Sequence, residues 1–509
     1  MLEKIKLSCE KFPDRNAFFI GGVYYTYYQF AMHVSKIRYE LENSCHGEKL
    51  IAIITNESPD IEPYASIYAC WFAGCGFVPI NPDDPINKNL AILEQTEIKT
   101  ILSGTYDEKA NKISTVSGAR IITTHNLAET KINLDIHEIN YEEIAYILYT
   151  SGSTGIPKGV PITWNNLVSF SEAFFNLGYN LDENDRFLQM FDLTFDFSVI
   201  CYTIPLCLGA CVYTIEPEGV KYANVYMALE GNEITFACMV PVILPYLRPY
   251  FEDIYLKKLK YSLFCGEILY ADIAKEWNKC IPNGVIINAY GPTEATIFCL
   301  IYNCEDDKNS IKRYNGGVSI GKPMKDMNAI VVDEELKLVP KGTIGELCLS
   351  GKQVTNGYWK NPEKNKEAFF HYTISGVDKV FYRTGDLAFW DDDDFFMFAG
   401  RIDTQIKVQG YRIELGEIEH FTREFTNNTN VVAVSYKNRI GIVQIHLFVE
   451  NYSGKTTDIE QYLKKRVPYY MIPSNITILS SFPLNANGKV DRKKLTEIAQ
   501  PNKITDKIN

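Results

Sequence analysis

Short apolar runs separated by helix-length polar and apolar patterns dominate the first part of the chain. The runs LIAIIT (residues 50–55), YILYT (residues 146–150) and GVIINAY (residues 284–290) have the length and composition of buried strands. Strands that alternate with helices are typical of α/β folds. We therefore expect an α/β fold, and the length of 509 residues allows about three folding units of ~150 residues each.

The pattern changes after Gly316. Short alternating runs such as NAIVVD and IGELCLSG, broken by Gly and Pro, predict a β-rich subdomain. Beyond Arg401 the pattern becomes a compact mixture of helices and strands. The run DDDD (residues 391–394) lies between LAFW and FFMFAG, and we interpret it as the solvated turn of a β-hairpin, with a metal site as the alternative.

Composition argues against several classes of protein. Apolar residues make up 46% of the chain, but no continuous apolar run approaches the ~20 residues needed to cross a bilayer, so membrane insertion is not expected. We see no secretion signal at the start. The 13 cysteines include no C-x-x-C pair, which argues against a disulfide framework or a zinc site. A net charge of −12 disfavours nucleic-acid binding. Together with the lack of a recognisable secretion signal, this predicts a cytoplasmic enzyme that acts on small molecules.

The segment YTSGSTGIPKG (residues 149–159) packs five hydroxyl side chains, three glycines and one lysine into a loop after a strand. Backbone N–H groups and hydroxyls in such a loop can cradle phosphate oxygens. It is not a Walker loop, because Pro157 precedes Lys158 and the next residues look extended. The first helix start is expected only at Thr163, as an N-cap. Taken alone, the segment has a flexible connector as its alternative.

Four further motifs follow this loop in order: NAYGPTEATI (residues 288–297), YRTGDL (residues 382–387), GRIDTQIKVQGYRIELGEIEH (residues 400–420) and NGKVDRKKL (residues 487–495). Together the five resemble the signature series of the adenylate-forming enzymes, the superfamily of amino-acid adenylation domains, acyl-CoA synthetases and luciferases. Weaker matches at YTYYQF and FAGCGFVPINPDDP extend the resemblance over essentially the whole chain. It implies a large N-terminal α/β domain (residues 1–402) with a β-rich subdomain, followed by a small mobile α+β C-terminal domain (residues 403–509).

The resemblance also implies the chemistry. Enzymes of this superfamily join a carboxylate to the α-phosphate of ATP, release pyrophosphate, and pass the activated acyl group to a thiol. Lys158 would contact phosphate or brace a nearby carboxylate. The loop would hold the β- and γ-phosphates through Thr150, Ser151, Gly152, Ser153, Thr154 and Gly155.

The motif NAYGPTE would contact the rest of the nucleotide. By resemblance, Tyr290 would pack against the adenine, with Asn288 and Ala289 beside it. Thr293 would reach the α-phosphate and Glu294 would hold Mg²⁺, which takes few protein carboxylates and several phosphate oxygens. Thr293 and Glu294 are therefore catalytic candidates. An ordinary strand and Gly-Pro turn is the alternative for this motif alone.

The later motifs would complete the site. Asp386 would accept hydrogen bonds from both ribose hydroxyls, or else is a turn residue. Arg401 would approach the ribose or a phosphate, or else forms a surface ion pair. Lys489 would be the catalytic cation that bridges the substrate carboxylate and the α-phosphate, although alone it reads as a surface lysine. Asp403 matches the family's hinge, where a rotation would withdraw Lys489 and bring residues 409–414 to the site; a simple turn residue is the alternative.

The segment FDLTFDFSV (residues 191–199) resembles the amino-acid branch, in which the carboxylate at Asp196 pairs with the substrate ammonium. An Asp that bonds to local backbone is the alternative. A charge-assisted bond of ~1.5–3 kcal/mol would favour amino acids over desamino acids by about ten- to a hundredfold. The family's pocket positions fall on an apolar set with no partner for a charged side chain: Phe197, Ile200, Cys238, Leu263, Cys265, Ala289, Ile297 and Phe298.

The segment SLFCGEIL (residues 262–269) is most similar to the D-alanine–carrier protein ligases. There Cys265 would crowd Cα of the substrate and, with Gly266, help to select the D-enantiomer; a core cysteine is the alternative. Those ligases usually carry Thr where this chain has Ala289. D-Alanine is therefore the favoured substrate, and a small L-amino acid stays open.

The expected acceptor is a separate phosphopantetheinylated carrier protein, because the chain stops shortly after NGKVDRKKL. Such carriers are usually acidic, and LKKRVPYY (residues 463–470) is either a basic docking patch or a solvated helix end. Two other classes stay open. In an acyl-CoA synthetase for a small carboxylic acid, Asp196 would have no ammonium to pair with. A non-catalytic binding protein would tolerate loss of Lys489, Glu294 or Asp386, yet all three are present.

Overall fold

The computed structural model describes residues 1–45, 47–55, 59–105, 108–151, 156–304, 311–374, 376–427, 430–484 and 490–500. Contacts within the chain divide it into two compact units. The large unit holds residues 1–82, 92–149 and 159–402, and the small unit holds residues 83–91, 150–158 and 403–509. The assignment of residues 403–509 as a mobile domain stays a prediction.

The largest sheet has nine strands in the order β17-β14-β13-β12-β11-β9-β10-β1-β2. Six of them pair in parallel, and antiparallel pairing adds β2 at one end of the sheet and β14, followed by β17, at the other. From β9 the chain continues to β10 on one side and then to β11 on the other, and ligands of α/β sheets bind at the carboxyl ends of strands where the order reverses in this way. The strands are β1 (Asn16–Ile20), β2 (Val23–Thr26), β9 (Arg186–Gln189), β10 (Cys211–Thr214), β11 (Phe236–Met239), β12 (Tyr261–Phe264), β13 (Val285–Tyr290), β14 (Leu300–Asn303) and β17 (Lys322–Pro323).

A second sheet has six strands in the order β6-β5-β3-β4-β7-β8. The strands predicted at residues 50–55 and 146–150 are β3 and β7, and the extended residues after Lys158 form β8, so these predictions are confirmed. The strands are β3 (Leu50–Ile54), β4 (Gly76–Ile80), β5 (Thr100–Ser103), β6 (Arg120–Thr123), β7 (Ile144–Thr150) and β8 (Lys158–Thr163).

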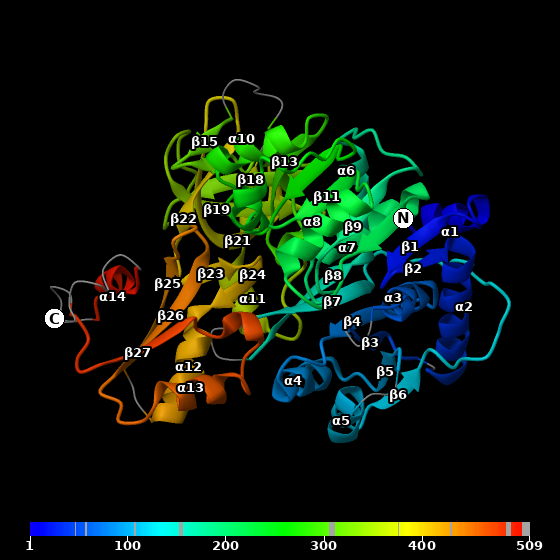
Figure 1. Ribbon diagram of the computed structural model, residues 1–509, viewed down its shortest axis with the longest axis horizontal. Helices are drawn as coiled ribbons and strands as arrows, with labels where there is room; N and C mark the ends of the chain where they lie inside the picture. Colours follow the sequence, from blue (N-terminus) through cyan, green and yellow to red (C-terminus); the bar gives the residue numbers. More distant parts are fainter. Residues whose placement is uncertain are drawn as a thin grey trace. The chain divides into compact units, whose positions relative to one another are not determined.

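Two helices, α3 and α7, lie between these sheets (Figure 1). Every residue of α3 is buried, and a helix that is apolar all round belongs in a core. Tyr68 of α3 donates a hydrogen bond to the carbonyl of Tyr202 in α7 at 2.9 Å. Thr163 caps α6 with a capping box to Asn166, as expected. The helices before residue 403 are α1 (Leu2–Lys11), α2 (Tyr27–Ser44), α3 (Glu62–Phe72), α4 (Ile86–Thr96), α5 (Glu108–Ser117), α6 (Trp164–Phe175), α7 (Phe197–Leu208), α8 (Lys221–Gly231), α9 (Ile243–Leu247), α10 (Ala271–Cys280) and α11 (Pro362–Ala368).

The β-rich subdomain is confirmed as a five-stranded sheet, with β15 (Arg313–Tyr314) and β16 (Gly317–Val318) as a separate pair. The run of four aspartates is the turn between β21 and β22, where Lys312 pairs with Asp391 at 2.7 Å and with Asp393 at 2.6 Å. The hairpin interpretation is therefore confirmed. The strands are β18 (Met327–Val332), β19 (Gly345–Gly351), β20 (Phe369–Ile374), β21 (Val377–Trp390) and β22 (Phe396–Arg401).

The small unit is a mixture of helices and strands with two apolar cores. Alternate residues of β25 point to opposite faces of a three-stranded sheet, so Val431 and Ala433 join one core while Val432 and Val434 join the other. None of the helices that the structure describes is long and apolar enough to span a membrane. The elements are β23 (Gln405–Val408), β24 (Tyr411–Glu414), α12 (Leu415–Thr426), β25 (Val431–Lys437), β26 (Val443–Glu450), α13 (Thr456–Leu463), β27 (Asn475–Leu479) and α14 (Arg492–Ala499).

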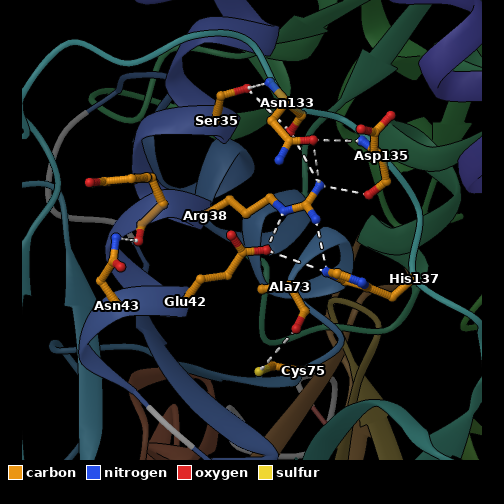
Figure 2. Close-up of polar contacts among 10 residues, drawn as sticks. Ser35, Arg38, Glu42, Asn43, Ala73, Cys75, Asn133, Asp135 and His137 are labelled. Atoms are coloured by element: carbon orange, nitrogen blue, oxygen red, sulfur yellow. Dashed lines mark hydrogen bonds and ion pairs between the residues drawn. The ribbon is translucent and has the colours of Figure 1, made fainter.

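An extended segment, residues 127–140, is fastened to α2 by the buried side chain of Arg38. Figure 2 shows the guanidinium directed at Glu42, at the backbone carbonyl of Asp135 and at His137. The donor-to-acceptor distances are 2.8, 2.6 and 2.9 Å, respectively. Arg38 is 2% exposed, so these partners must offset the free-energy cost of burying its positive charge.

Replacing Arg38 with Met should lower the free energy of unfolding of the large unit by about 2–4 kcal/mol, because its partners lose a charged donor. All five tryptophans lie in this unit, so tryptophan fluorescence during urea unfolding reports on it. Asp135→Asn is the matched control: it removes the ion pair with Lys6 but keeps the carbonyl that Arg38 uses, and its midpoint should equal that of the wild type. Equal midpoints for Arg38→Met and the wild type would contradict this role.

His446 in β26 is a buried histidine, with 3% of its surface exposed. Its Nε2 lies 2.8 Å from Thr477 Oγ1, and its ring stacks on that of Phe448 with 4.2 Å between the ring centroids. Its Nδ1 has no hydrogen-bond partner among the residues described. Burial lowers the pKa of His446 to about 4. The imidazole is therefore neutral in the folded protein at neutral pH.

The stability of the small unit should fall as the pH decreases from about 6.5 to about 4, because the unfolded histidine then binds a proton that the folded one does not. The expected loss is about 1.4 kcal/mol per pH unit across this window. Hydrogen exchange of the β26 amides, compared at each pH with the non-titrating variant His446→Gln, measures the effect. Identical protection of the two proteins at all pH values would show that His446 does not cause it.

Candidate active site

The carboxyl ends of β9 and β13 bring Asp196 and Thr293 together. Asp196 follows β9 at the start of α7 and is 8% exposed, and Thr293 begins a single 3₁₀ turn after β13. Thr293 Oγ1 donates a hydrogen bond to Asp196 Oδ2 at 2.6 Å. The loop before Asp196 is anchored by Asp192, which accepts hydrogen bonds from Asn81 at 2.6 Å and from the Thr194 backbone at 2.8 Å.

Glu294, the expected Mg²⁺ ligand, is fully buried. Tyr358 donates its phenolic hydrogen bond to Glu294 Oε1 at 2.6 Å, and the Tyr382 hydroxyl lies 3.3 Å from that of Tyr358. The backbone of Tyr358 is itself held by Asn365. Tyr358 was not found from the sequence, because a tyrosine 64 residues away carries no local signal of this contact.

Asp386 in β21 lies opposite Arg401 in β22, and the two side chains form an ion pair. Asp386 also accepts a hydrogen bond from the hydroxyl of Tyr290. Burial, reinforced by the charge of Asp386, raises the pKa of Tyr290 well above its usual value, so the phenol stays a neutral donor. Tyr290 was expected to pack against adenine. In the structure its hydroxyl also contacts Asp386, the residue expected to bind the ribose.

The residues expected around the amino-acid side chain are buried and belong to one core cluster. Their elements are α7, β11, β12 and β13 with the residues that follow these strands. Gly266, next to Cys265, has a φ of 98°, a backbone conformation that favours glycine. Asn288, expected beside adenine, donates to the carbonyl of Ser319 at 2.8 Å. The buried set is Phe197, Ile200, Cys238, Leu263, Cys265, Ala289, Ile297 and Phe298.

Two β-branched residues after Glu294 have positive φ angles, 55° for Thr296 and 72° for Ile297. The Phe298 N–H donates to the Thr296 carbonyl at 2.9 Å, so Ile297 is the centre of a positive-φ γ-turn, which is rare and strained. Thr296 Oγ1 donates to the carbonyl of Gln353 and holds the turn. Strain of this kind collects at functional sites, and no sequence preference predicts it.

The loop residues of the small unit have their own partners. Ser151 Oγ donates to the carbonyl of Arg412 at 2.8 Å, and Lys158 Nζ lies 3.4 Å from Glu414 Oε1. Lys158 is thus beside a carboxylate, which is one of its two expected positions. Thr150 Oγ1 is buried without a hydrogen-bond partner among the described residues, which fits a hydroxyl kept for a ligand.

The roles expected for the other residues of the small unit stay predictions. Asp403 Oδ1 accepts a hydrogen bond from the Gln405 N–H at 3.1 Å, as a turn residue would, and its hinge role stays a prediction. In the segment 463–470, Lys464 pairs with Glu460 and Arg466 with Glu424, so most of its positive charge is balanced. Gly152, Ser153, Thr154, Gly155 and Lys489 lie outside the described residues.

The residues described fit a magnesium ion better than a metal held only by protein. No group of three or more His, Cys, Asp or Glu side chains among them could hold a metal ion. Mg²⁺ needs only one or two carboxylates when phosphate oxygens complete its ligands. Glu294 alone can meet that requirement, and its role as ligand stays a prediction.

Comparison with known proteins decides the family. The sequence profile of the family described as AMP-binding enzyme matches residues 5–359. The chain belongs to this family. Tyrocidine synthase 1 of Brevibacillus parabrevis is 30% identical over 492 residues, which are 96% of this chain but only 44% of that synthase. The D-alanine–D-alanyl carrier protein ligase of Bacillus cereus (strain AH187) is 30% identical over 514 residues, which are 97% of this chain and 98% of that ligase.

Solved structures show the fold. The Vibrio cholerae adenylation domain AlmE, in complex with glycyl-adenosine-5'-phosphate, matches with a TM-score of 0.85 at 24% identity, covering 98% of this chain and 97% of AlmE. PA1221, a protein containing adenylation and PCP domains, matches with a TM-score of 0.84 at 22% identity, covering 97% of this chain and 83% of PA1221. The expected resemblance and the α/β fold class are therefore confirmed.

Gly291→Ala should destabilise the large unit by about 1–3 kcal/mol, because an added Cβ would lie 2.4 Å from Phe298 Cα beside the strained turn. The atoms that the added Cβ would meet belong to the backbone, which cannot move out of the way as the end of a flexible side chain can. Gly231→Ala is the control, since nothing lies within 4 Å of its added Cβ at the end of α8. Urea unfolding followed by tryptophan fluorescence should show a lower midpoint only for Gly291→Ala, and an unchanged midpoint would contradict this tight approach.

Proposed function

We propose that this chain is a ligase that uses ATP to activate a small amino acid as aminoacyl-AMP and then transfers the aminoacyl group to a separate phosphopantetheinylated carrier protein. D-Alanine is the favoured substrate and a small L-amino acid is the alternative. The proposal includes Mg²⁺ as cofactor, a cytoplasmic location, and residues 403–509 as a mobile domain with Asp403 as its hinge.

The buried carboxylate of Asp196 carries this proposal. It is 8% exposed and lies one hydrogen bond from Thr293, the residue expected at the α-phosphate. A buried carboxylate is a good binding partner for an ammonium group, which offers both a positive charge and hydrogen-bond donors. The buried positions expected around the substrate side chain are apolar, which supports a small uncharged side chain.

In the first step, a carboxylate oxygen of the amino acid would attack the α-phosphorus of ATP. The bond from that phosphorus to the oxygen shared with the β-phosphate would break, and pyrophosphate would leave with the electron pair. Thr293 would donate to the α-phosphate, and Lys489 would stabilise the charge that develops there. Asp386 would hold the ribose hydroxyls. Glu294 would hold Mg²⁺, which offsets phosphate charge when bound.

In the second step, the thiolate sulfur of the carrier would attack the acyl carbon, and the bond from that carbon to the AMP oxygen would break. The thiol loses its proton to solvent and AMP leaves. Similarity to a D-alanine–D-alanyl carrier protein ligase and to PA1221, which contains a PCP domain, supports a carrier protein as the acceptor. None of the thirteen cysteines, all of which are among the described residues, forms a disulfide, and this supports a reducing compartment.

Pyrophosphate exchange with D-alanine, L-alanine, glycine and propionate should show exchange that is about ten- to a hundredfold faster with the preferred amino acid than with propionate. Asp196→Asn should remove this preference, because a neutral amide no longer pairs with the ammonium. Propionate is the internal control, since exchange with it should be similar in both proteins. A wild type that prefers propionate, or an Asp196→Asn protein that keeps the amino-acid preference, would overturn the proposal.

A further inference from the structure

The hydrogen bond from Thr293 to Asp196 joins two groups that the proposed function assigns to different ligands. Asp196 is expected to bind the ammonium of the amino acid, and Thr293 is expected to bind the α-phosphate of ATP. In the structure the two side chains bind each other, at 2.6 Å from Oγ1 to Oδ2. They lie 97 residues apart and follow different strands, so the contact depends on the tertiary fold.

A threonine hydroxyl has a single proton and can donate it to one acceptor at a time. While Asp196 accepts this proton, the same proton cannot be donated to a phosphate oxygen. An ammonium group brings three donors of its own, so an amino acid can replace Thr293 as the donor to Asp196. The hydroxyl is then available to the α-phosphate.

We infer that Thr293 couples the two substrates: its hydroxyl moves from Asp196 to the α-phosphate when the amino-acid ammonium takes over the carboxylate, so that amino acid and ATP bind cooperatively. This inference rests on the proposed function. Coupling of this kind is reciprocal, so ATP must tighten amino-acid binding by the same factor.

The same contact adds a second check on the substrate. An acid without an ammonium group brings no donor that could replace Thr293 at Asp196, so the hydroxyl stays bonded to Asp196 and away from the α-phosphate. Such an acid makes no ammonium contact with Asp196, and it does not displace the Thr293 hydroxyl from Asp196 either. Thr293 is therefore a positioning residue for specificity as well as a contact for phosphate.

Calorimetric titration of the full chain with α,β-methylene-ATP, alone and with saturating D-alanine, L-alanine, glycine or propionate, measures the coupling. In the wild type the preferred amino acid should tighten binding of the analogue on the order of tenfold, as expected for one hydrogen bond to a charged group. Propionate should have no such effect. Adenosine, which has no phosphate, should bind equally with and without the amino acid.

Thr293→Val keeps the shape of the side chain but lacks the hydroxyl, and its coupling factor should fall to about one. Thr293→Ser keeps the hydroxyl and should retain the coupling, which separates this role from packing. Tryptophan fluorescence confirms that each variant is folded. A Thr293→Val protein with the wild-type coupling factor, or a wild type with equal coupling by propionate, would overturn the inference.

The two hypotheses fail in different ways. If amino acids bind the wild type with the same affinity at every concentration of the ATP analogue, only the coupling is wrong. If the analogue binds but none of the three amino acids does, the proposed function is wrong and the coupling falls with it.

Discussion

A carboxylate removed from water needs hydrogen-bond donors, and this requirement organises the large unit around three acidic side chains. Asp196, Glu294 and Asp386 are 8%, 0% and 6% exposed. Asp196 bonds to Thr293 and Glu294 to Tyr358, both distant in the sequence, and Asp386 bonds to the distant Tyr290 and to Arg401 on the neighbouring strand. The strands and turns that carry these donors must therefore be in place before any of the carboxylates is stable in its position.

The end of β13 and the segment that follows it hold several of these groups. Within a few residues they supply Tyr290, Thr293 and Glu294, and the chain then reverses through the strained turn at Ile297. A strained backbone of this kind costs on the order of 1–3 kcal/mol and persists only where its surroundings hold it. The Thr296 side chain and the ladder bond from Cys299 to Tyr290 provide that support. The energetic cost of the turn is thus balanced by contacts that also align the polar side chains before it.

Local sequence patterns predicted the parts of the fold that depend on neighbouring residues. The strands β3, β7 and β13, the helix that begins after Thr163 and the aspartate turn follow from apolar runs, a cap and turn chemistry. The extended segment 127–140 was not predicted, because its position depends on Arg38 in α2. The γ-turn was not predicted either, since Ile disfavours positive φ and tertiary contacts override that preference.

The same limit applies to the candidate site. Motifs predicted which residues carry chemistry, whereas the partners of these residues lie far away in the sequence: Tyr358 is 64 residues from Glu294, and Glu414 is 256 residues from Lys158. Neither the hydrophobic periodicity of the sequence nor the spacing of its motifs indicates such pairs. The structure supplies these contacts among the described residues, while the chemical roles of all the site residues stay predictions from the motifs.

The chemical nature of the donors separates the three carboxylates. The hydroxyl of Thr293 bonds to Asp196 and that of Tyr358 to Glu294, and a hydroxyl orients a carboxylate without itself neutralising the charge. The proposed function assigns a cationic ligand to each of these two carboxylates, an ammonium group to Asp196 and a magnesium ion to Glu294. Asp386 instead pairs with the guanidinium of Arg401, so its charge is already balanced. A balanced carboxylate is better suited to accept hydrogen bonds from neutral ribose hydroxyls than to attract a second cation.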